Sequence, residues 1–289
     1  AYVLKSFKPN EGYVLEARQG HWRGDAKIKN IFMQHIPEGA TERLLLEKGD
    51  IDIARELTPT DLEGLAGNAD VKIQGDVGGQ VYYLALNQKK AELANPKVQE
   101  AMRWAIDFTG MQDSILKGLW VVHQTFLPKG FLGSIDENPY SLDIEKAKAL
   151  MAESGLTLPI EIGFTVRNNQ ERMDIATSIQ NTFAQIGINL VMDVGDGAQG
   201  LATYRGRLHD ITLQTWGPDY PDPHTNASTF ALNPDNSDAA NATGYLAWRT
   251  AWDPGADLNA ETEAAVVEKD SAKRAEMYGD IQRKVRDNS

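Results

Sequence analysis

The sequence feature that most constrains the fold is a strand–helix–strand pattern over residues 160–194. Apolar residues alternate with polar ones over 160–166, recur at helical spacing over 176–186, and then favour one face again over 188–194. Gly187 separates the helical stretch from the second strand. Two strands joined by a helix of this length are expected to pair in parallel, with a right-handed crossover. The pattern therefore predicts an α/β fold.

A third strand is predicted at 211–216, after a shorter helix over 198–208. Ligands of parallel sheets bind beyond the carboxyl ends of the strands. If all three strands are parallel, the segments that follow them share one rim of the sheet. These segments are residues 167–169, 195–197 and 216–224.

The segment 216–224 is the strongest candidate for a binding wall. It holds one Trp, one Tyr, two Asp, one His and three Pro. Proline fixes φ and removes a hydrogen-bond donor, so this segment is expected to be stiff. A stiff loop that carries aromatic faces and carboxylates suits a binding site, but a rigid surface turn whose Trp216 simply packs would look the same. We expect the chain to continue from it as a polar loop, and to be irregular over 230–255.

Composition narrows the function classes. The chain has 289 residues and a net charge of −12, from 29 basic and 41 acidic residues. Nucleic acid and anionic membrane surfaces need a basic footprint, so neither is an expected partner. Cysteine is absent, which removes disulfides and thiolate chemistry. No apolar run approaches the ~20 residues of a membrane span, so direct membrane insertion is not expected. The length suggests about two domains.

The first 90 residues predict several short strands and helices. Residues 2–4 and 13–15 predict a hairpin, and the alternation at 51–54 predicts another strand. Thr58 followed by Pro59 is typical of a helix start. A mostly apolar strand is expected at 81–87.

Residues Gly195 to Gly200 match the G-x-G-x-x-G pattern of dinucleotide-binding turns, and Asp219 lies about 20 residues further on. The pattern follows a predicted strand and opens a predicted helix, as the fingerprint requires. However, the helix is short, and no second nucleotide-binding half follows it. The alternatives are a dinucleotide-dependent enzyme and a flexible strand-to-helix turn.

Other chemistry finds little support in the sequence. Asp219, Asp222 and His224 could ligate a metal, but their spacing fits no standard zinc or calcium pattern. Ser114 to Lys117 matches S-x-x-K without the companion motifs of penicillin-recognising enzymes. No carboxylate pair stands out as an acid and base. We therefore expect no catalytic residue, no cofactor and no metal, and the chain is not predicted to be an enzyme.

Four spaced segments occur in order along nearly the whole chain. They are YVL with VLE and WRG (residues 2–24), TERLLLEKGDIDIA (41–54), NPKVQEA with AID (95–107) and WGPDYPDP (216–223). Together they resemble the motifs of family 5 extracellular solute-binding proteins, the peptide-type receptors of bacterial ABC importers.

The resemblance implies a periplasmic-binding-protein-like α/β fold of two lobes that close on a cargo. It places residues 1–80 in an incomplete part of lobe one and residues 81–289 in most of lobe two. Family members are much longer, so the chain is expected to be a fragment that lacks the N-terminal part and the C-terminal end. The implied localisation is the bacterial periplasm. The implied partners are a peptide or peptide-like solute, an ABC permease in the inner membrane, and the missing part of the same receptor.

The resemblance also implies a binding site. Asp219 would pair with the N-terminal ammonium of a peptide, and Trp216 would line a side-chain pocket. Backbone groups around Thr215 and Gly217 would pair with the peptide main chain, in the manner of an added strand. The candidate substrate-binding residues are Asp219, Trp216, Gly217, Thr215, Tyr220 and Asn168.

Two departures leave the cargo open. Leu213 stands where some oligopeptide binders place an Arg, and Gly197 stands where some place a Trp. The cargo is therefore a peptide or another solute, such as a dipeptide, an opine-like compound, an oligosaccharide or a metal chelate. A further alternative is that the chain binds nothing by itself, because half of the cleft would lie outside it.

Overall fold

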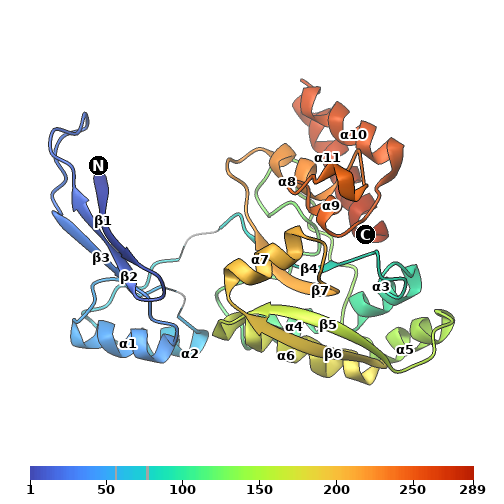
Figure 1. The fold of residues 1–289 in the computed structure, drawn as a ribbon, viewed down its shortest axis with the longest axis horizontal. Coiled ribbons are helices and arrows are strands. Elements are labelled where there is room, and N and C mark those ends of the chain that lie inside the picture. The colour runs from blue at the N-terminus through green and yellow to red at the C-terminus, as the bar shows by residue number, and fades with distance from the viewer. Residues whose placement is uncertain (56, 76–77) are drawn as a thin grey trace. The chain divides into compact units, whose positions relative to one another are not determined.

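The computed structural model describes residues 1–55, 57–75 and 78–289 (Figure 1). Its contacts divide the chain into two compact units, Ala1–Ile73 and Gln74–Ser289, which we call unit 1 and unit 2. Unit 2 combines helices with a mixed sheet, so the α/β class predicted from the sequence is confirmed.

Unit 1 is built on a small antiparallel sheet. Its strands, in the order β1-β2-β3, are β1 (Tyr2–Lys8), β2 (Gly12–Ala17) and β3 (Asn30–Gln34). The predicted N-terminal hairpin is confirmed, because β1 pairs antiparallel with β2. The helices of this unit are α1 (Gly39–Lys48) and α2 (Pro59–Leu65). Thr58 caps α2 in a capping box with Asp61, as the Thr-Pro signal predicted.

The strand predicted at residues 51–54 does not form. Alternation makes a strand only where another strand offers a free edge, and this segment instead runs back along α1. The backbone N–H of Arg55 donates to the Glu42 carboxylate on that helix at 2.9 Å. The prediction was wrong because a four-residue alternation says nothing about its partner.

Unit 2 contains a four-stranded sheet in the order β4-β7-β5-β6. The strands are β4 (Val81–Leu86), β5 (Ile160–Arg167), β6 (Ile188–Gly195) and β7 (Ile211–Trp216). β5 pairs in parallel with both β6 and β7, which confirms the predicted parallel core. β4 adds to β7 in the antiparallel sense.

Helices cover both faces of this sheet (Figure 1). The long helix α6 (Gln170–Gln185) lies on one face and α7 (Gly197–Arg205) on the other. Phe164 of β5 and Phe183 of α6 are fully buried in the core between sheet and helix. The same core receives apolar residues from α3 (Pro96–Trp104), α4 (Phe108–Asp113) and α5 (Ile144–Glu153).

A second, helical core closes the C-terminal part. It is formed mainly by α8 (Pro223–Phe230), α9 (Leu246–Arg249), α10 (Gly255–Val267) and α11 (Ser271–Asn288). The polar loop expected after residue 224 is therefore wrong. Asp222 caps α8 and Pro223 occupies its first turn, a start signal that the surrounding polar residues concealed. The short α9 and a 3-10 turn at Asp238–Ala240 also interrupt the expected irregular stretch.

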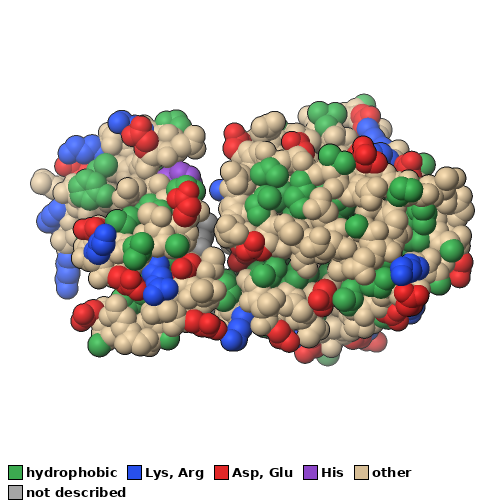
Figure 2. Space-filling view, turned by 90° about the horizontal axis from the view of Figure 1, so that it is seen from below, with side chains coloured by type: hydrophobic (Ala, Val, Ile, Leu, Met, Phe, Trp, Pro, Cys, Tyr) green, Lys and Arg blue, Asp and Glu red, His purple; other side chains and the backbone are tan. Residues whose placement is uncertain are grey.

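The surface of each unit carries charges of both signs. Figure 2 shows acidic and basic side chains interspersed on the face that it presents. Among the described residues, no helix combines the length and apolar character needed to cross a membrane.

His209 is a buried titratable group between α7 and β7. Its side chain is only 3% exposed and its ring meets the Tyr204 ring edge-on at 5.0 Å. Neither ring nitrogen has a hydrogen-bond partner among the described residues. Burial lowers the pKa of His209 to about 4, against a smaller opposing effect of the Asp210 carboxylate.

This pKa makes the stability of the fold depend on pH. Between about pH 6.5 and pH 4 the unfolded chain binds a proton at His209 and the folded chain does not, so stability falls as the pH falls. We expect His209→Gln to remove a pH-dependent part of the unfolding free energy on the order of 3 kcal/mol across this range. Urea titrations at pH 7 and pH 4.5 measure it, with the exposed His35→Gln as control. Equal pH slopes in all three proteins would contradict the burial argument.

Candidate functional site

The parallel sheet brings three strand ends to one rim, which we call the carboxyl rim. β5 ends at Arg167, β6 at Gly195 and β7 at Trp216, and the register pairs Arg167 with Gly195. The antiparallel β4 begins at the same rim, because Val81 pairs with Trp216. The rim predicted from the sequence is therefore confirmed.

β7 extends past its ladder with β5. The two strands pair only at Phe164 with Ile211 and at Thr165 with Thr212. β7 continues to Trp216, and on its other side β4 pairs with it along the whole length. Beyond Thr212, the edge of β7 that faces β5 therefore has no ladder partner on β5.

Arg172, in the first turn of α6, reaches this departing edge. Its guanidinium donates to the Leu213 carbonyl at 3.0 Å and to the Thr215 hydroxyl at 2.8 Å. The side chain is buried, and its charged end lies 5.4 Å from the centre of the Tyr82 ring. No carboxylate in the described part of the chain forms an ion pair with it. Arg172 therefore holds the end of β7 through hydrogen bonds alone.

The neighbouring Glu171 accepts hydrogen bonds from two aromatic residues that lie beneath the rim. Its carboxylate accepts from the Tyr82 hydroxyl at 2.5 Å and from the Trp120 indole N–H at 3.0 Å. The rings of Tyr82 and Trp120 lie 4.5 Å apart. The start of α6, the start of β4 and the loop after α4 are thereby joined behind the rim.

Trp216 lies half-buried on the opposite face of the sheet. Its ring meets Phe230 of α8 edge-on at 5.8 Å, and Tyr83 meets the same Phe230 at 5.2 Å. Burial raises the pKa of Tyr83 to about 12, so its phenol stays protonated. Trp216 packs as the surface-turn interpretation expected, and part of the residue stays exposed. Its role in binding stays a prediction.

The two aspartates of the loop have different surroundings. Asp219 is exposed and makes no hydrogen bond or ion pair with any described residue. Asp222, three residues later, caps α8 by accepting from the backbone N–H of His224 at 2.8 Å. It also accepts from both terminal nitrogens of Arg274 on α11, each at 2.9 Å. Of these two aspartates, Asp219 is the one whose carboxylate has no partner in the described part of the chain.

Arg274 connects the loop to the C-terminal helices. Besides its two bonds to Asp222, it donates through Nε to the Ala265 carbonyl of α10 at 3.1 Å. These charge-assisted bonds lower the pKa of Asp222 below its usual range, so the pair is ionised at neutral pH.

The other nominated residues also lie at the rim. Thr215 is half-buried and bonded to Arg172, and Tyr220 and Asn168 are exposed. Gly217 lies against Gln80, where a Cβ would approach the Gln80 side chain to 2.9 Å. All six nominated residues thus belong to β7 or to the segments that follow β5 and β7.

The G-x-G-x-x-G turn also lies on the rim, at the start of α7. Asp196 caps this helix, its carboxylate accepting from the Gln199 N–H at 2.8 Å. A dinucleotide would place its pyrophosphate at such a helix start. A capping carboxylate occupies the same N–H groups and repels phosphate. Gly197 instead makes room for the exposed Arg167, whose Nε would lie 3.1 Å from a Cβ at that position.

Metal ligation finds no support at this rim. No group of three potential ligands among the described His, Asp and Glu residues could hold a metal ion. Asp222 is committed to Arg274, and burial lowers the pKa of His224.

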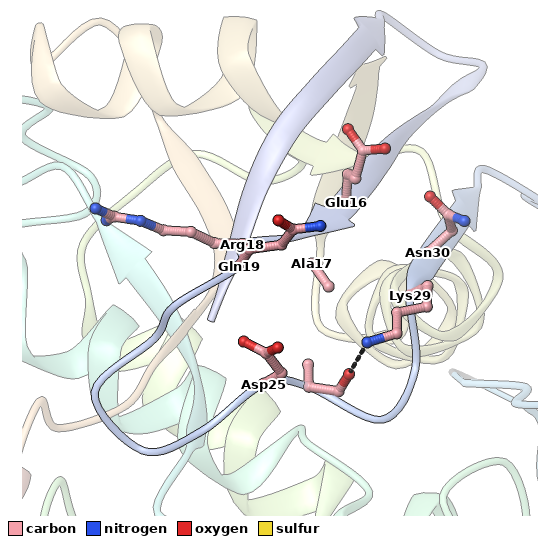
Figure 3. Close-up of a pocket in the computed structure, with 8 residues that line it drawn as sticks. Glu16, Ala17, Arg18, Gln19, Asp25, Lys29 and Asn30 are labelled. Carbon is pink, nitrogen blue, oxygen red and sulfur yellow. Dashed lines mark hydrogen bonds between the residues drawn. The ribbon is translucent and has the colours of Figure 1, made fainter.

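A depression of about 450 Å³ lies within unit 1 (Figure 3). It is formed by the end of β2 and the loop that leads to β3. Asp25 already accepts from the Gly20 N–H and Lys29 donates to the Ala26 carbonyl. Figure 3 shows Arg18 pointing away from Asp25 and Lys29, so these side chains do not converge on a common point. We place the candidate site at the rim for this reason.

Sequence reasoning did not identify Glu171, Arg172 or Arg274. Their local signals are ordinary, because charged residues in an amphipathic helix are expected on its solvated face. The one available signal was Asp222 before Pro223, which marks a helix start and separates the two aspartates by role.

Comparison with known proteins places these features in a family. The family model described as bacterial extracellular solute-binding proteins, family 5 middle, matches residues 1–238. A probable D,D-dipeptide-binding periplasmic protein of Escherichia coli (strain K12) is 29% identical over 229 residues, which cover 77% of this chain and 43% of that protein. The nickel-binding periplasmic protein of the same strain is 27% identical, covering 100% of this chain and 57% of that protein.

The fold also matches solved structures. An ABC transporter-associated periplasmic binding protein from Helicobacter pylori, in complex with the peptide STSA, superposes with a TM-score of 0.90 at 21% identity. The match covers 99% of this chain and 55% of that one. The predicted periplasmic-binding-protein-like fold is thereby confirmed. This chain spans about half the length of the relatives that it matches.

The different surroundings of the two aspartates predict different effects on stability. Asp222→Ala removes a helix cap and both bonds to Arg274, so we expect it to lower the unfolding free energy by about 2 kcal/mol. Asp219→Ala removes an exposed side chain, and we expect a change within about 0.5 kcal/mol. Urea denaturation of both variants measures the difference. Equal losses would show that Asp219 is also part of the scaffold.

Proposed function

Because this chain belongs to family 5 of the bacterial extracellular solute-binding proteins, we propose that it carries the cargo-binding rim of an ABC importer's receptor. The cargo is a peptide or peptide-like solute with a free ammonium group, held at the carboxyl rim and delivered to a membrane permease. Unit 2 supplies most of one lobe and unit 1 part of the other. The receptor works in the periplasm and catalyses no reaction.

The observation that carries this proposal is the exposed Asp219, which has no hydrogen bond or ion pair with any described residue and lies on a proline-rich loop. An ammonium group is a strong donor to a carboxylate, and the bond is stronger where the site is partly desolvated. Three prolines hold the backbone around Asp219, so little conformational entropy is lost on binding. Asp222 cannot take this role, because Arg274 already occupies both of its oxygens.

The departing edge of β7 supports a peptide main chain as part of the cargo. Beyond Thr212 this edge leaves its ladder with β5, and an extended peptide binds such an edge with little regard to its side chains. Thr215 adds a hydroxyl that already accepts a hydrogen bond from Arg172 and can donate one to a carbonyl.

Arg167 supplies the opposite charge on the neighbouring strand end. It is exposed, and it has no ion-pair partner among the described residues. Asp219 and Arg167 together offer one anion and one cation to a zwitterionic solute. The relatives named for nickel and for dipeptides differ in their cargo, so the chemical test below compares an amine-bearing peptide with a metal chelate.

Asp219→Asn tests the ammonium contact. We expect the variant to bind trialanine roughly 10- to 100-fold more weakly, since one charge-assisted hydrogen bond is lost. N-acetyl-trialanine has no ammonium group, so its affinity should be low and equal in both proteins. Isothermal titration calorimetry with the two peptides and with a nickel–histidine complex measures the preference.

Asp196→Asn is the matched control on the same rim. Asparagine caps a helix as well as aspartate does, so this variant removes a charge without removing the start of α7. It should keep the wild-type affinity for trialanine. Tight binding of the nickel–histidine complex, with no response to trialanine, would favour the metal-chelate alternative and contradict the proposed cargo.

A further inference from the structure

The loop that carries Asp219 is anchored at each of its ends by one arginine. Arg172 of α6 holds the end of β7 through Leu213 and Thr215. Arg274 of α11 holds the start of α8 through Asp222. Between these anchors lie residues 216–221, and they include Asp219.

We propose that Arg172 and Arg274 form a two-arginine clamp that positions Asp219 for its cargo. Neither arginine contacts the cargo, and both act through the loop between them. The part of the inference that concerns cargo rests on the proposed function of Asp219, whereas the ordering of the loop does not.

Burying the Arg172 guanidinium in the first turn of a helix costs free energy, which argues for a specific role. A buried cation requires compensation, and the first turn of a helix disfavours positive charge. Arg172 lies there with only 8% of its surface exposed. Its compensation comes from the Leu213 carbonyl, the Thr215 hydroxyl and the face of Tyr82, all of which belong to the end of β7 or to its partner strand. The contacts of the Arg172 guanidinium therefore serve to hold the end of β7 in place.

The Arg274 contact has the geometry that restrains a loop most strongly. Two nearly equal bonds of 2.9 Å join its two terminal nitrogens to the two oxygens of Asp222, which fixes orientation as well as distance. The third donor, Nε, is bonded to Ala265 at the end of α10, and a terminal nitrogen also reaches the Tyr278 hydroxyl at 3.4 Å. Movement of Asp222 would disturb both C-terminal helices.

Between the anchors the loop has few internal bonds of its own. The backbone N–H of Asp222 donates to the Tyr220 carbonyl at 2.8 Å, and Pro218 and Pro221 have no N–H to donate. Asp219 itself has no bond to a described residue. Its place therefore depends on the proline backbone and on the two anchored ends.

Lysine substitutions test the clamp because they keep the charge but lose the paired donors. In Arg172→Lys and Arg274→Lys we expect backbone amides within residues 215–222 to exchange with deuterium roughly tenfold faster than in wild type. This measurement is made on the purified protein without cargo, so it does not depend on the proposed function. Unchanged exchange over 215–222 in both variants would overturn the clamp.

Matched controls separate this role from a general loss of stability. Arg207 is 5% exposed and binds backbone carbonyls of residues 236 and 248, and Arg283 of α11 binds Glu137 with its paired donors. Arg207→Lys and Arg283→Lys should leave exchange over 215–222 unchanged. If a lysine variant of the clamp fails to fold, two substitutions weaken the contacts from the other side. Thr215→Val removes one of the two acceptors of Arg172, and Asp222→Asn removes the charge and one of the two acceptor oxygens that Arg274 uses, while Asn keeps the helix cap.

A second readout links the clamp to the cargo. We expect the ratio of the Kd for N-acetyl-trialanine to that for trialanine to fall roughly tenfold in Arg172→Lys and in Arg274→Lys. A variant that is merely less stable would weaken both peptides alike and keep the ratio. An unchanged ratio in these variants, where Asp219→Asn abolishes it, would overturn the positioning role. An unchanged ratio in Asp219→Asn, with faster exchange in the clamp variants, would instead reject the ammonium site and support the clamp as a loop anchor.

Discussion

The parallel pairing of β5 with β6 and β7 is the constraint on which the candidate site depends. Ile162, Phe164 and Val166 of β5 are at most 1% exposed, so this strand is central to the core of unit 2. A buried parallel sheet directs every strand end to the same edge. Each strand that joins it in parallel therefore adds its following loop to a single rim, and the loop that carries Asp219 reaches that rim through β7.

At the end of β7, a side chain replaces a neighbouring strand as the hydrogen-bond partner. Its ladder with β5 stops at Thr212, and the Arg172 guanidinium takes over the Leu213 carbonyl. This hydrogen bond from a side chain gives the buried backbone carbonyl a partner without another strand. Asp222 has no free oxygen because it caps α8 and also forms the ion pair with Arg274. Asp219 takes part in neither contact.

The sequence predicted much of this arrangement. The alternation over 160–166, the helical spacing over 176–186 and the strand after Gly187 gave the correct order and type of elements, because each depends on residues close together in the chain. The three strand ends were placed on one rim because parallel pairing of the strands was expected. The strand expected at 51–54 and the loop expected after residue 224 were wrong, because a short alternation lacks a partner and a polar helix looks like a loop.

Local capping and the position of Asp219 on a proline-rich turn were determined by the sequence alone. Asp196, Asp222 and Asp270 each cap the helix that follows them, through bonds that span only two or three residues. Tertiary structure decided that the second commitment of Asp222 is an ion pair with Arg274. The Arg274–Asp222 pair spans 52 residues and the Arg172–Thr215 bond spans 43, and both require helices to pack at particular angles on the sheet. No local pattern encodes such contacts, because a charged residue on a helix looks the same whether it meets water or a distant carboxylate.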